Sequence, residues 1–377
     1  MVTIKKVEGK KDLARFIDFP HELYKDDPNY VPELFIAQRD MLDVTKKKNL
    51  HPFHLHSKLD LFLAENDGKI VGRIAAIRNN NHIAYTGLNE GFFGFFDVEN
   101  NYEVAKKLFD TVVEWQKKEK LTGVSGPVNF STNETCGLLI EGFDSPPVVM
   151  MTYNRKYYAD FLDKYGFKKK MDMFAYLLDV KTPAPELMRM QKLLSRRLES
   201  KGITIRTANM KKFGEETERL KGIYNSAWEK NWGFVPMTDD EFRYMAKDLK
   251  MIVDPDFCLL AEHNGKTVGF ALVLPDINVI LRTIKKGRLL PTGIFKLLFQ
   301  KKKIKLGRII TLGVIDGYRK MGIDAVFYSM IWETAARKNY DYGEASWILE
   351  SNEMMNRAMI NAGGRVYKKY RIYDYKF

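Results

Sequence analysis

The chain has 377 residues and a formal net charge of +13 at pH 7, and this length is too great for one hydrophobic core and favours two domains. Its apolar content of 45% excludes an intrinsically disordered chain. The charged N-terminal sequence, and the lack of any apolar run near the roughly 18 residues of a membrane span, argue against a signal peptide and a transmembrane protein.

The two cysteines, Cys136 and Cys258, lack the spacing of a metal site. So few cysteines are typical of a reducing compartment, and we expect a cytoplasmic protein. In "HPFHLH" (51–56), His54 and His56 would share one face of a strand, but no Cys or acidic ligand lies beside them in the sequence. We therefore predict no metal site.

The apolar pattern predicts the same succession of elements twice. In the first half it predicts strands at 3–7 and 91–98, a hairpin at 63–72, a long helix at 103–118 and a helix that ends at Gly166. In the second half it predicts strands at 203–207 and 308–315, a hairpin at 260–269, a long helix at 323–338 and a helix that ends at Gly363. One or two further helices stand between the first strand and the hairpin of each half.

The two hairpins are near copies. "LAENDGKIVG" (63–72) and "LAEHNGKTVG" (260–269) share seven of ten residues at an offset of 197, and Gly166 and Gly363 have the same offset. We interpret the chain as a tandem duplication with halves 1–180 and 190–377, joined near the two prolines of "VKTPAPEL". Each half is predicted to be α+β, with a mixed, mostly antiparallel sheet flanked by helices.

The positive charge is concentrated in one segment. Residues 282–308 contain ten Lys or Arg and no acid. Leu, Ile and Phe are interleaved with these cations. One interpretation is therefore that the segment contacts anionic lipid or nucleic acid. The other is a solvated loop and short helix beside a site for an anionic small molecule. We favour the second, because one short segment is a small footprint for nucleic acid.

The stretch "GVIDGYRKMGIDAVF" (313–327) joins a predicted strand directly to an amphipathic helix. The first turn of a helix has unpaired N–H groups and the positive end of the helix dipole, which together bind phosphate. Gly322 allows close approach of the backbone, and Arg319 and Lys320 bring positive charge. The stretch therefore predicts a phosphate or pyrophosphate cradle, with an ordinary basic turn as the alternative.

This order of elements around R-x-x-G-x-x resembles the GNAT superfamily of acyl-CoA-dependent N-acyltransferases, whose phosphate loop is Q/R-x-x-G-x-G/A. Arg319 and Gly322 match that loop, and Asn352 stands at the family's usual asparagine. The resemblance implies acetyl-CoA or another acyl-CoA as co-substrate, in a V between the fourth and fifth strands. It implies that the following residues bind it: Leu312, Gly313, Val314, Arg319, Lys320, Met321, Gly322, Ile323, Asp324 and Asn352.

The sequence departs from the family pattern at three places. Asp324 replaces the final Gly or Ala of the loop, and Met359 stands where many members have a tyrosine that protonates the leaving thiolate, so no general acid is assigned. The equivalent loop of the first half (97–107) has no glycine and contains two glutamates. The first half is therefore predicted to be a degenerate copy. Its long insertion, 126–154, has either an acceptor-site or an interdomain role.

For the acceptor, Trp228, Asn231, Trp232, Asp276 and Asn278 are candidate binding residues. Alternatively, the tryptophans fill a domain interface and the two polar residues simply end a strand. Glu344, on the strand beside the expected thioester, is the first candidate for the general base, and Glu350 is the second.

We predict acyl transfer to the amine of a small molecule or peptide by direct attack on the thioester, with the N–H groups around Leu312 to Val314 polarising its carbonyl. Two alternatives remain: a decayed ligand-binding protein on this fold, and an aminoacyl-tRNA-dependent transferase, suggested by the basic segment. Nucleic acid is not favoured as a partner, but tRNA stays open.

Overall fold

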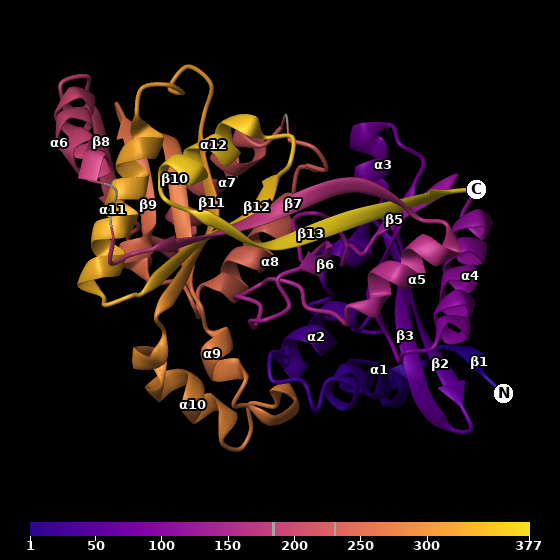
Figure 1. Ribbon diagram of the computed structural model, residues 1–377. Coiled ribbons are helices and arrows are strands. Elements are labelled where there is room, and N and C mark those ends of the chain that lie inside the picture. The colour runs from indigo at the N-terminus through magenta and orange to yellow at the C-terminus, as the bar shows by residue number, and fades with distance from the viewer. Residues whose placement is uncertain (183–184, 230) are drawn as a thin grey trace. The chain divides into compact units, whose positions relative to one another are not determined.

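A computed structural model of the chain describes residues 1–182, 185–229 and 231–377, without the side chains of residues 185–191 and 227 (Figure 1). The chain forms two compact units, and neither is one continuous stretch. The first unit comprises Met1–Met173, Asn278–Gln300 and Lys368–Phe377, and the second comprises Phe174–Ile277 and Lys301–Tyr367. The halves 1–180 and 190–377 therefore stay a prediction about the duplication, and residues 183–184 of their junction lie outside the described residues.

The first unit is built around one mixed sheet. Its elements are β1 (Thr3–Lys6), α1 (Gly9–Leu23), α2 (Phe35–Leu42), β2 (Lys58–Asn66), β3 (Lys69–Arg78), α3 (Asn80–Thr86), β4 (Gly91–Val98), α4 (Tyr102–Lys118), β5 (Gly123–Gly126), β6 (Leu138–Glu141), α5 (Tyr157–Tyr165), α9 (Asn278–Leu281) and α10 (Gly293–Phe299). Strands β1 to β4 pair antiparallel in sequence order, and β4 pairs parallel with β5.

Two long strands, β7 (Lys168–Asp179) and β13 (Arg365–Lys376), divide their residues between the units. The C-terminal part of β13 belongs to the first unit, where residues 369–371 pair antiparallel with β6 and residues 373–376 pair antiparallel with β5. The first unit's core thus includes side chains from both ends of the chain. Tyr373 is buried in the same cluster as Phe93, Phe109 and Phe167.

The second unit repeats this arrangement. Its elements are α6 (Pro185–Glu199), β8 (Ile203–Thr207), α7 (Phe213–Ala227), α8 (Asp239–Leu249), β9 (Cys258–His263), β10 (Lys266–Pro275), β11 (Leu306–Val314), α11 (Ile323–Arg337), β12 (Tyr342–Leu349) and α12 (Glu353–Asn361). Strands β8 to β11 pair antiparallel in order, and β11 pairs parallel with β12. The predicted α+β class, with a mixed and mostly antiparallel sheet flanked by helices, is confirmed.

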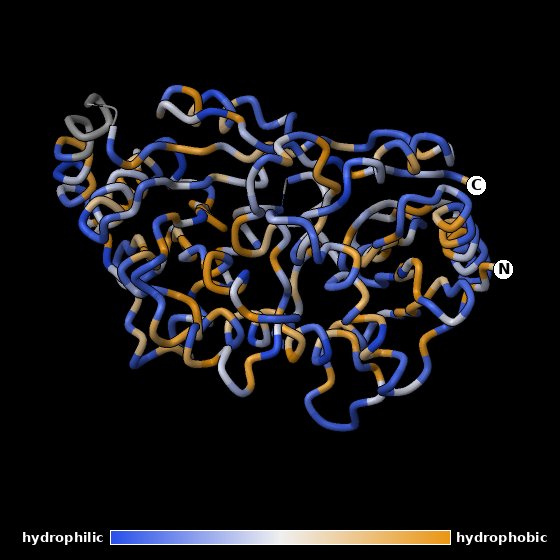
Figure 2. Tube along the Cα trace, turned by 60° about the horizontal axis from the view of Figure 1, so that its bottom comes forward, coloured by the Kyte–Doolittle hydropathy of each residue, from blue (hydrophilic) through white to orange (hydrophobic). Residues whose placement is uncertain are grey.

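The predicted hairpins are present in both units. Asp67 and Gly68 have φ of 50° and 80°, and Asn264 and Gly265 have φ of 51° and 76°. Two consecutive left-handed residues are the requirement of the tight turn that matches the twist of a hairpin, which is why Asp-Gly and Asn-Gly occur there. Along the strands and helices, hydrophobic and hydrophilic positions alternate in bands (Figure 2), as expected for elements that bury one face.

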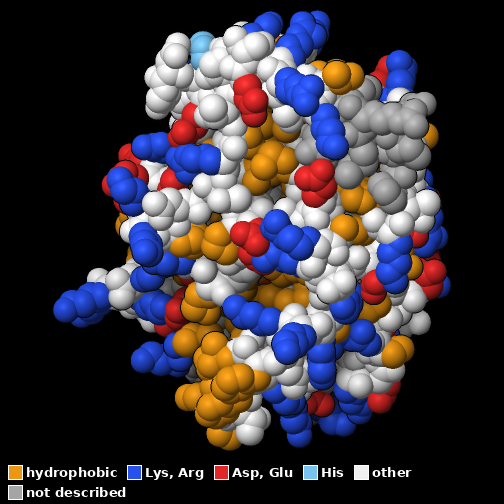
Figure 3. All heavy atoms as spheres, turned by 90° about the vertical axis from the view of Figure 1, so that its left-hand side faces the viewer, with side chains coloured by type: hydrophobic (Ala, Val, Ile, Leu, Met, Phe, Trp, Pro, Cys, Tyr) orange, Lys and Arg blue, Asp and Glu red, His pale blue; other side chains and the backbone are white. Residues whose placement is uncertain are grey.

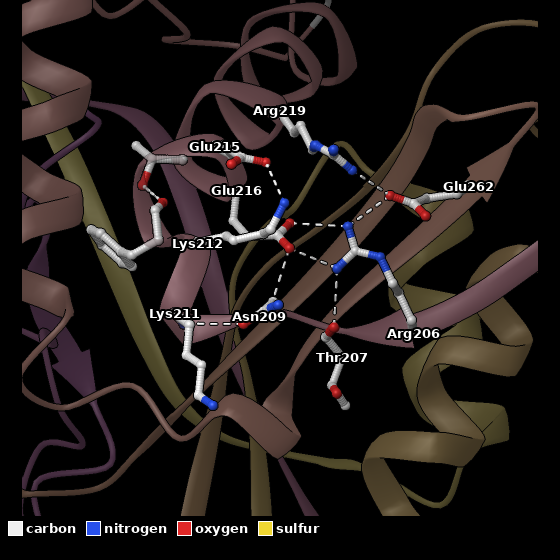
Figure 4. Close-up of polar contacts among 11 residues, drawn as sticks. Arg206, Thr207, Asn209, Lys211, Lys212, Glu215, Glu216, Arg219 and Glu262 are labelled. Carbon is white, nitrogen blue, oxygen red and sulfur yellow. Dashed lines mark hydrogen bonds and ion pairs between the residues drawn. The ribbon is translucent and has the colours of Figure 1, made fainter.

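Each unit also ties the helix that follows its first strand (α1 or α7) to its first two strands with ion pairs. In the second unit, Arg206 of β8 donates to both carboxylate oxygens of Glu216 at 2.8 and 3.1 Å, and to Glu262 at 2.7 Å, which also accepts from Arg219 at 2.8 Å (Figure 4). Glu216 is 6% exposed, so its charge depends on these partners.

The first unit has the matching set. Lys5 of β1 pairs with Asp12 at 2.8 Å, and Arg15 pairs with Asp12 at 3.4 Å and with Glu65 at 2.7 Å. In both units, the cluster consists of a cation on the first strand, an acid and a cation one turn apart on the helix that follows this strand, and a hairpin glutamate. This arrangement supports the duplication independently of the hairpin sequences. Within the described part of the chain, no helix is both long and apolar enough to cross a bilayer.

Candidate active site

Strands β11 and β12 separate part of the way along their length. They pair in parallel from Leu306 and Tyr342 only as far as Ile309 and Ala345. Strand β11 then bulges by one residue opposite β10 and continues to Val314, paired with β10 alone among the described strands. Beyond that register, the β11 edge that contains Leu312, Gly313 and Val314 has no strand on its β12 side among the described residues, and we call this end of the β11–β12 pairing the opening.

The loop that follows β11 leads directly into the first turn of α11. Gly317, Lys320 and Gly322 have φ of 86°, 63° and 92°, and Gly322 is the residue before the helix. Repeated left-handed residues turn successive N–H groups to one side and make an anion-binding concavity. The left-handed conformation favours glycine at position 322, and a Cβ there would lie 2.9 Å from Leu194 Cδ2 of α6 and displace the end of that side chain.

The cations of this loop are arranged as follows. Arg319 Nε donates to the carbonyl of Val314 at 3.1 Å, and its guanidinium lies 2.9 Å from the Asp316 carboxylate. Lys320 is exposed, Met321 is half-buried and Ile323 is buried at the base of α11. Arg319 therefore braces the loop against the end of β11 as well as adding positive charge to it.

Asp324 is exposed in the first turn of α11. Tyr328 follows one turn later, and its hydroxyl contacts Met355 Sδ of α12 at 3.3 Å. Burial, and then the charge of Asp324, raise the pKa of Tyr328 well above its usual value. The Asp324 carboxylate therefore acts on the face of α11 that looks toward α12, where it would oppose a bound anion.

Asn352 begins α12, and its side chain accepts a hydrogen bond from the N–H of Met355 at 3.1 Å. Sequence reasoning missed its neighbour Asn356, whose amide donates to the carbonyls of Leu349 and Asn352 at 2.9 and 3.0 Å. Together the two asparagines hold the turn that connects β12 to α12. A second asparagine four residues after the first was the available signal.

Two polar atoms at the separating strands are buried and unsatisfied. Thr311 Oγ1 of β11 and Trp347 Nε1 of β12 have no hydrogen-bond partner among the described residues. Buried polar atoms are almost always paired, so these two orphaned atoms on neighbouring strands need an explanation. A ligand between β11 and β12 would supply it.

Glu344 lies one register before the end of the β11–β12 pairing, opposite Arg308 of β11, and both side chains are buried. The carboxylate accepts hydrogen bonds from Ser346 Oγ at 2.7 Å and from the Tyr367 hydroxyl, and Arg308 Nε lies 3.8 Å away. Arg308 also donates to Ser346 at 2.9 Å. The candidate base is thus held by side chains from three strands. The sequence pointed to the glutamate but to none of these partners.

The candidate acceptor residues lie in both units. Trp228 stacks on Tyr224 with ring centroids 5.1 Å apart and lies edge-on to Phe270 of β10 at 5.7 Å. Asn231 and Trp232 belong to the turn after α7, where the N–H of Asn231 donates to the carbonyl of Trp228. Asp276 directly follows β10, and its N–H donates to the carbonyl of Leu306.

Asn278 belongs to the first unit and is buried. Its amide donates to the carbonyl of Pro147 at 2.8 Å, within the long insertion 126–154. These contacts assign Asn278 a structural role, while the acceptor roles of all five candidates stay predictions.

The matching opening of the first unit is filled by its own chain. Strands β4 and β5 pair in parallel only at Gly91–Val124 and Phe92–Ser125. Beyond that register, Val128 N–H donates to the carbonyl of Phe93 at 2.8 Å, and Asn129 Oδ1 accepts from Phe95 N–H at 2.9 Å.

The start of the insertion therefore occupies the edge of β4 that, in the second unit, has no strand partner. A Cβ on Gly94 would lie 2.4 Å from the carbonyl of Val128, which shows how closely the two segments approach. Only residues 99–101 separate β4 from α4, compared with 315–322 in the second unit. The first unit thus has neither the opening nor the cradle.

At the base of this filled opening lies a buried polar cluster. Lys170 Nζ contacts Glu90 at 2.5 and 2.7 Å and Ser125 Oγ at 2.8 Å, and His82 Nε2 lies 3.5 Å from Glu90. Burial acts to raise the pKa of Glu90, but the contacts with His82 and Lys170 outweigh it and lower the pKa to about 2. Lys170 is thus the counter-ion of Glu90 in this cluster.

The lowered pKa makes stability depend on pH. A carboxyl with a depressed pKa contributes stability above its unfolded pKa, near 4.5, and loses it as pH falls toward 2. We expect Glu90→Gln to lower the free energy of unfolding by on the order of 3 kcal/mol at neutral pH, and by progressively less as pH falls through this range. Urea unfolding at several pH values measures it. Asp67→Asn, at an exposed turn, is the control, and a constant difference across pH would contradict the assignment.

No protein-family model matches the chain. Among solved structures, the tandem GNAT protein from the clavulanic acid biosynthesis pathway aligns over 100% of this chain and 98% of its own, with a TM-score of 0.59 and 10% identity. A GCN5-related N-acetyltransferase from Sphaerobacter thermophilus aligns over 100% and 95%, with a TM-score of 0.55 and 15% identity. These likenesses show the tandem GNAT fold that the sequence predicted.

Two relatives are similar over almost their whole lengths. Protein YghO of Escherichia coli K12 is 36% identical over 372 residues, which cover 97% of this chain and 93% of that protein. The bacterial ceramide synthase of Caulobacter vibrioides is 36% identical over 375 residues, which cover 98% and 96%. The chain therefore belongs to the family that contains YghO and the bacterial ceramide synthase, a family with the tandem GNAT fold.

Proposed function

We propose that the protein transfers an acyl group from an acyl-CoA to an amine, and that the second unit binds the acyl-CoA. The observation that carries this proposal is the difference between the two openings. The one between β11 and β12 has a free strand edge, two orphaned polar atoms and a cradle at α11, whereas the one beside β4 is filled by Val128 and Asn129. One acyl-CoA per chain is expected.

The relative named bacterial ceramide synthase suggests the chemical class of both substrates. A ceramide is the amide of a fatty acid and a long-chain amino alcohol. We propose a fatty acyl-CoA as donor and a long-chain amino alcohol as acceptor, with acetyl-CoA as the second candidate donor. A cytoplasmic location stays a prediction.

In the proposed reaction, the amine nitrogen attacks the thioester carbonyl, the C–N bond forms, and the C–S bond breaks to release CoA as the thiol. The N–H groups along Leu312 to Val314 would stabilise the oxyanion. Because both Glu344 oxygens accept hydrogen bonds from Ser346 and Tyr367, we propose that the ammonium proton reaches the carboxylate through one of these hydroxyls.

Substitutions in the loop test the cradle with opposite expected signs. Gly322→Ala places a side chain at φ 92° beside Leu194 and is expected to weaken acyl-CoA binding about tenfold, since a left-handed non-glycine residue costs roughly 1–2 kcal/mol. Asp324→Asn removes a negative charge from the helix start and is expected to tighten binding roughly two- to fivefold. Isothermal calorimetry with CoA and a fatty acyl-CoA measures both.

Gly222→Ala is the matched control, because this α7 glycine has open space around it and an ordinary φ; it should leave binding unchanged. If the two glycine variants had equal effects, or if Asp324→Asn bound acyl-CoA more weakly, the assignment of this loop as the phosphate cradle would be wrong. Activity is followed as amine-dependent release of the CoA thiol and by the mass of the amide. Release of the thiol without an amide would favour a decayed ligand-binding protein. Transfer only from aminoacyl-tRNA would favour the aminoacyl-tRNA-dependent transferase.

A further inference from the structure

Helix α10 and the loop before it carry exposed large apolar side chains. Leu290, Phe295, Leu298 and Phe299 are 79%, 57%, 57% and 77% exposed, and no other ten-residue stretch of the described chain contains four such residues. We call these four residues the α10 face. Figure 3 shows a group of hydrophobic side chains that protrudes at the lower edge of that view, with Lys and Arg beside it.

The α10 face is ordered and points outward. Phe295, Leu298 and Phe299 follow the i, i+3, i+4 spacing of one helical stripe, which in a surface helix normally packs on the core. Here the stripe faces solvent, and the rings of Phe295 and Phe299 lie parallel with centroids 6.5 Å apart. An exposed apolar group of this size with polar residues around it marks a site of interaction.

The segment that carries the face is firmly attached to the first unit. Ile280 and Ile284 are buried. Arg288 pairs with Asp18 at 2.8 Å, and Lys286 pairs with Glu22 at 2.5 Å. Lys296 Nζ also donates to the carbonyl of Thr283 at 2.5 Å. The exposure of the apolar stripe is therefore not the result of a loosely held segment.

The charged residues of the segment itself have one sign, although Lys286 and Arg288 are paired with Glu22 and Asp18 of α1. Residues 282–303 contain eight Lys or Arg and no Asp or Glu. Lys301–Lys303 follow Phe299 almost directly along the chain, and all three are exposed. At about 3.8 Å between consecutive Cα atoms, covalent geometry keeps these lysines next to the apolar stripe.

We propose that the α10 face docks the protein on an anionic lipid bilayer. Such a bilayer has anionic headgroups for the lysines and, a few ångströms deeper, an apolar region for Phe and Leu, which is the arrangement that interfacial segments match. Single-stranded RNA fits less well, because Leu290 and Leu298 have no flat ring on which a base stacks. A two-fold contact between copies would bring the same lysines together.

Docking would bring the protein to a membrane-resident long-chain amine, and this purpose of docking rests on the proposed function. The α10 face itself is independent of that function. Co-sedimentation with vesicles tests it. The full chain is expected to bind vesicles that contain phosphatidylglycerol, to bind pure phosphatidylcholine vesicles weakly, and to lose binding as salt rises.

Two variants separate the apolar and the charged contributions. Phe295→Ser/Leu298→Ser/Phe299→Ser is expected to weaken binding to the anionic vesicles at least about tenfold. Lys301→Gln/Lys302→Gln/Lys303→Gln is expected to weaken binding at low salt and to remove most of the salt dependence. The control is Leu55→Ser/Met251→Ser, which changes residues that are 67% and 69% exposed elsewhere and should bind like the unmodified protein.

Failure to bind vesicles by the folded unmodified chain would overturn the proposal, as would equal loss of binding in the control. RNA binding lost in the lysine variant, or dimerisation lost in the apolar variant, each without vesicle binding, would assign the face to that partner instead. Acyl transfer to a short-chain, water-soluble amine without vesicles is measured on the same variants. Acyl transfer by a protein that does not bind vesicles would contradict only this inference. Vesicle binding by a protein that does not bind CoA would contradict only the proposed function.

Discussion

Deletion of residues 368–377 is expected to leave the first unit unable to fold, even though these are the last ten residues of the chain. They form the part of β13 that pairs with β5 and β6. Tyr370, Ile372 and Tyr373 are 0%, 1% and 1% exposed, and their loss would remove core volume and expose a sheet edge. We expect insoluble protein, or a chain whose second unit alone unfolds cooperatively.

A single substitution gives the same result in graded form. Tyr373→Ala is expected to lower the free energy of unfolding by about 3–5 kcal/mol, because a large side chain leaves the aromatic core of the first unit. Urea unfolding measures the loss. Lys376→Ala, at an exposed position on the same strand, should change it by less than about 0.5 kcal/mol. An unchanged urea midpoint for Tyr373→Ala would show that this strand does not stabilise the first unit.

Arg308→Met is expected to destabilise the second unit by about 3–5 kcal/mol, because it leaves the fully buried Glu344 carboxylate without a counter-ion. Arg308 and Glu344 are 1% and 0% exposed, so water cannot replace the lost partner. Chemical denaturation, followed by tryptophan fluorescence, measures the change.

The double variant Arg308→Met/Glu344→Met separates pairing from packing. Removing both charges should restore much of the stability, since apolar pairs of similar volume replace buried ion pairs at little cost. If the double variant were as unstable as Arg308→Met, the lost contact would be packing against Trp347, whose ring lies 4.9 Å from the guanidinium carbon. Retained acyl transfer in the folded double variant would also remove Glu344 as the base.

The repeat and most elements of the fold were accessible from the sequence. Alternating and helical apolar patterns act over short distances along the chain, so they predicted the strand at 91–98 and the start of the helix at Ile323 with the bounds that the structure has. The hairpin turns were predictable for the same reason, because Asp-Gly and Asn-Gly specify local dihedral angles.

The candidate site was only partly accessible. The R-x-x-G loop could be found because its residues are consecutive, and the structure places it where β11 enters α11. The cluster of Arg308, Glu344 and Tyr367 could not, since its members come from three strands and only the register brings them together. The same holds for Thr311 and Trp347, whose significance is their lack of a partner.

By itself, the sequence determined the duplication and the α+β class and predicted the position of an anion cradle, because these depend on patterns within one strand, turn or helix. The tertiary structure alone decided that residues 368–377 complete the first unit and that the start of the insertion fills the opening beside β4. Both outcomes depend on which strand edge a distant segment reaches, and hydrogen bonding between backbones has almost no sequence signature. For the same reason, only the structure distinguishes the unpaired β11 edge of the second unit from the occupied β4 edge of the first.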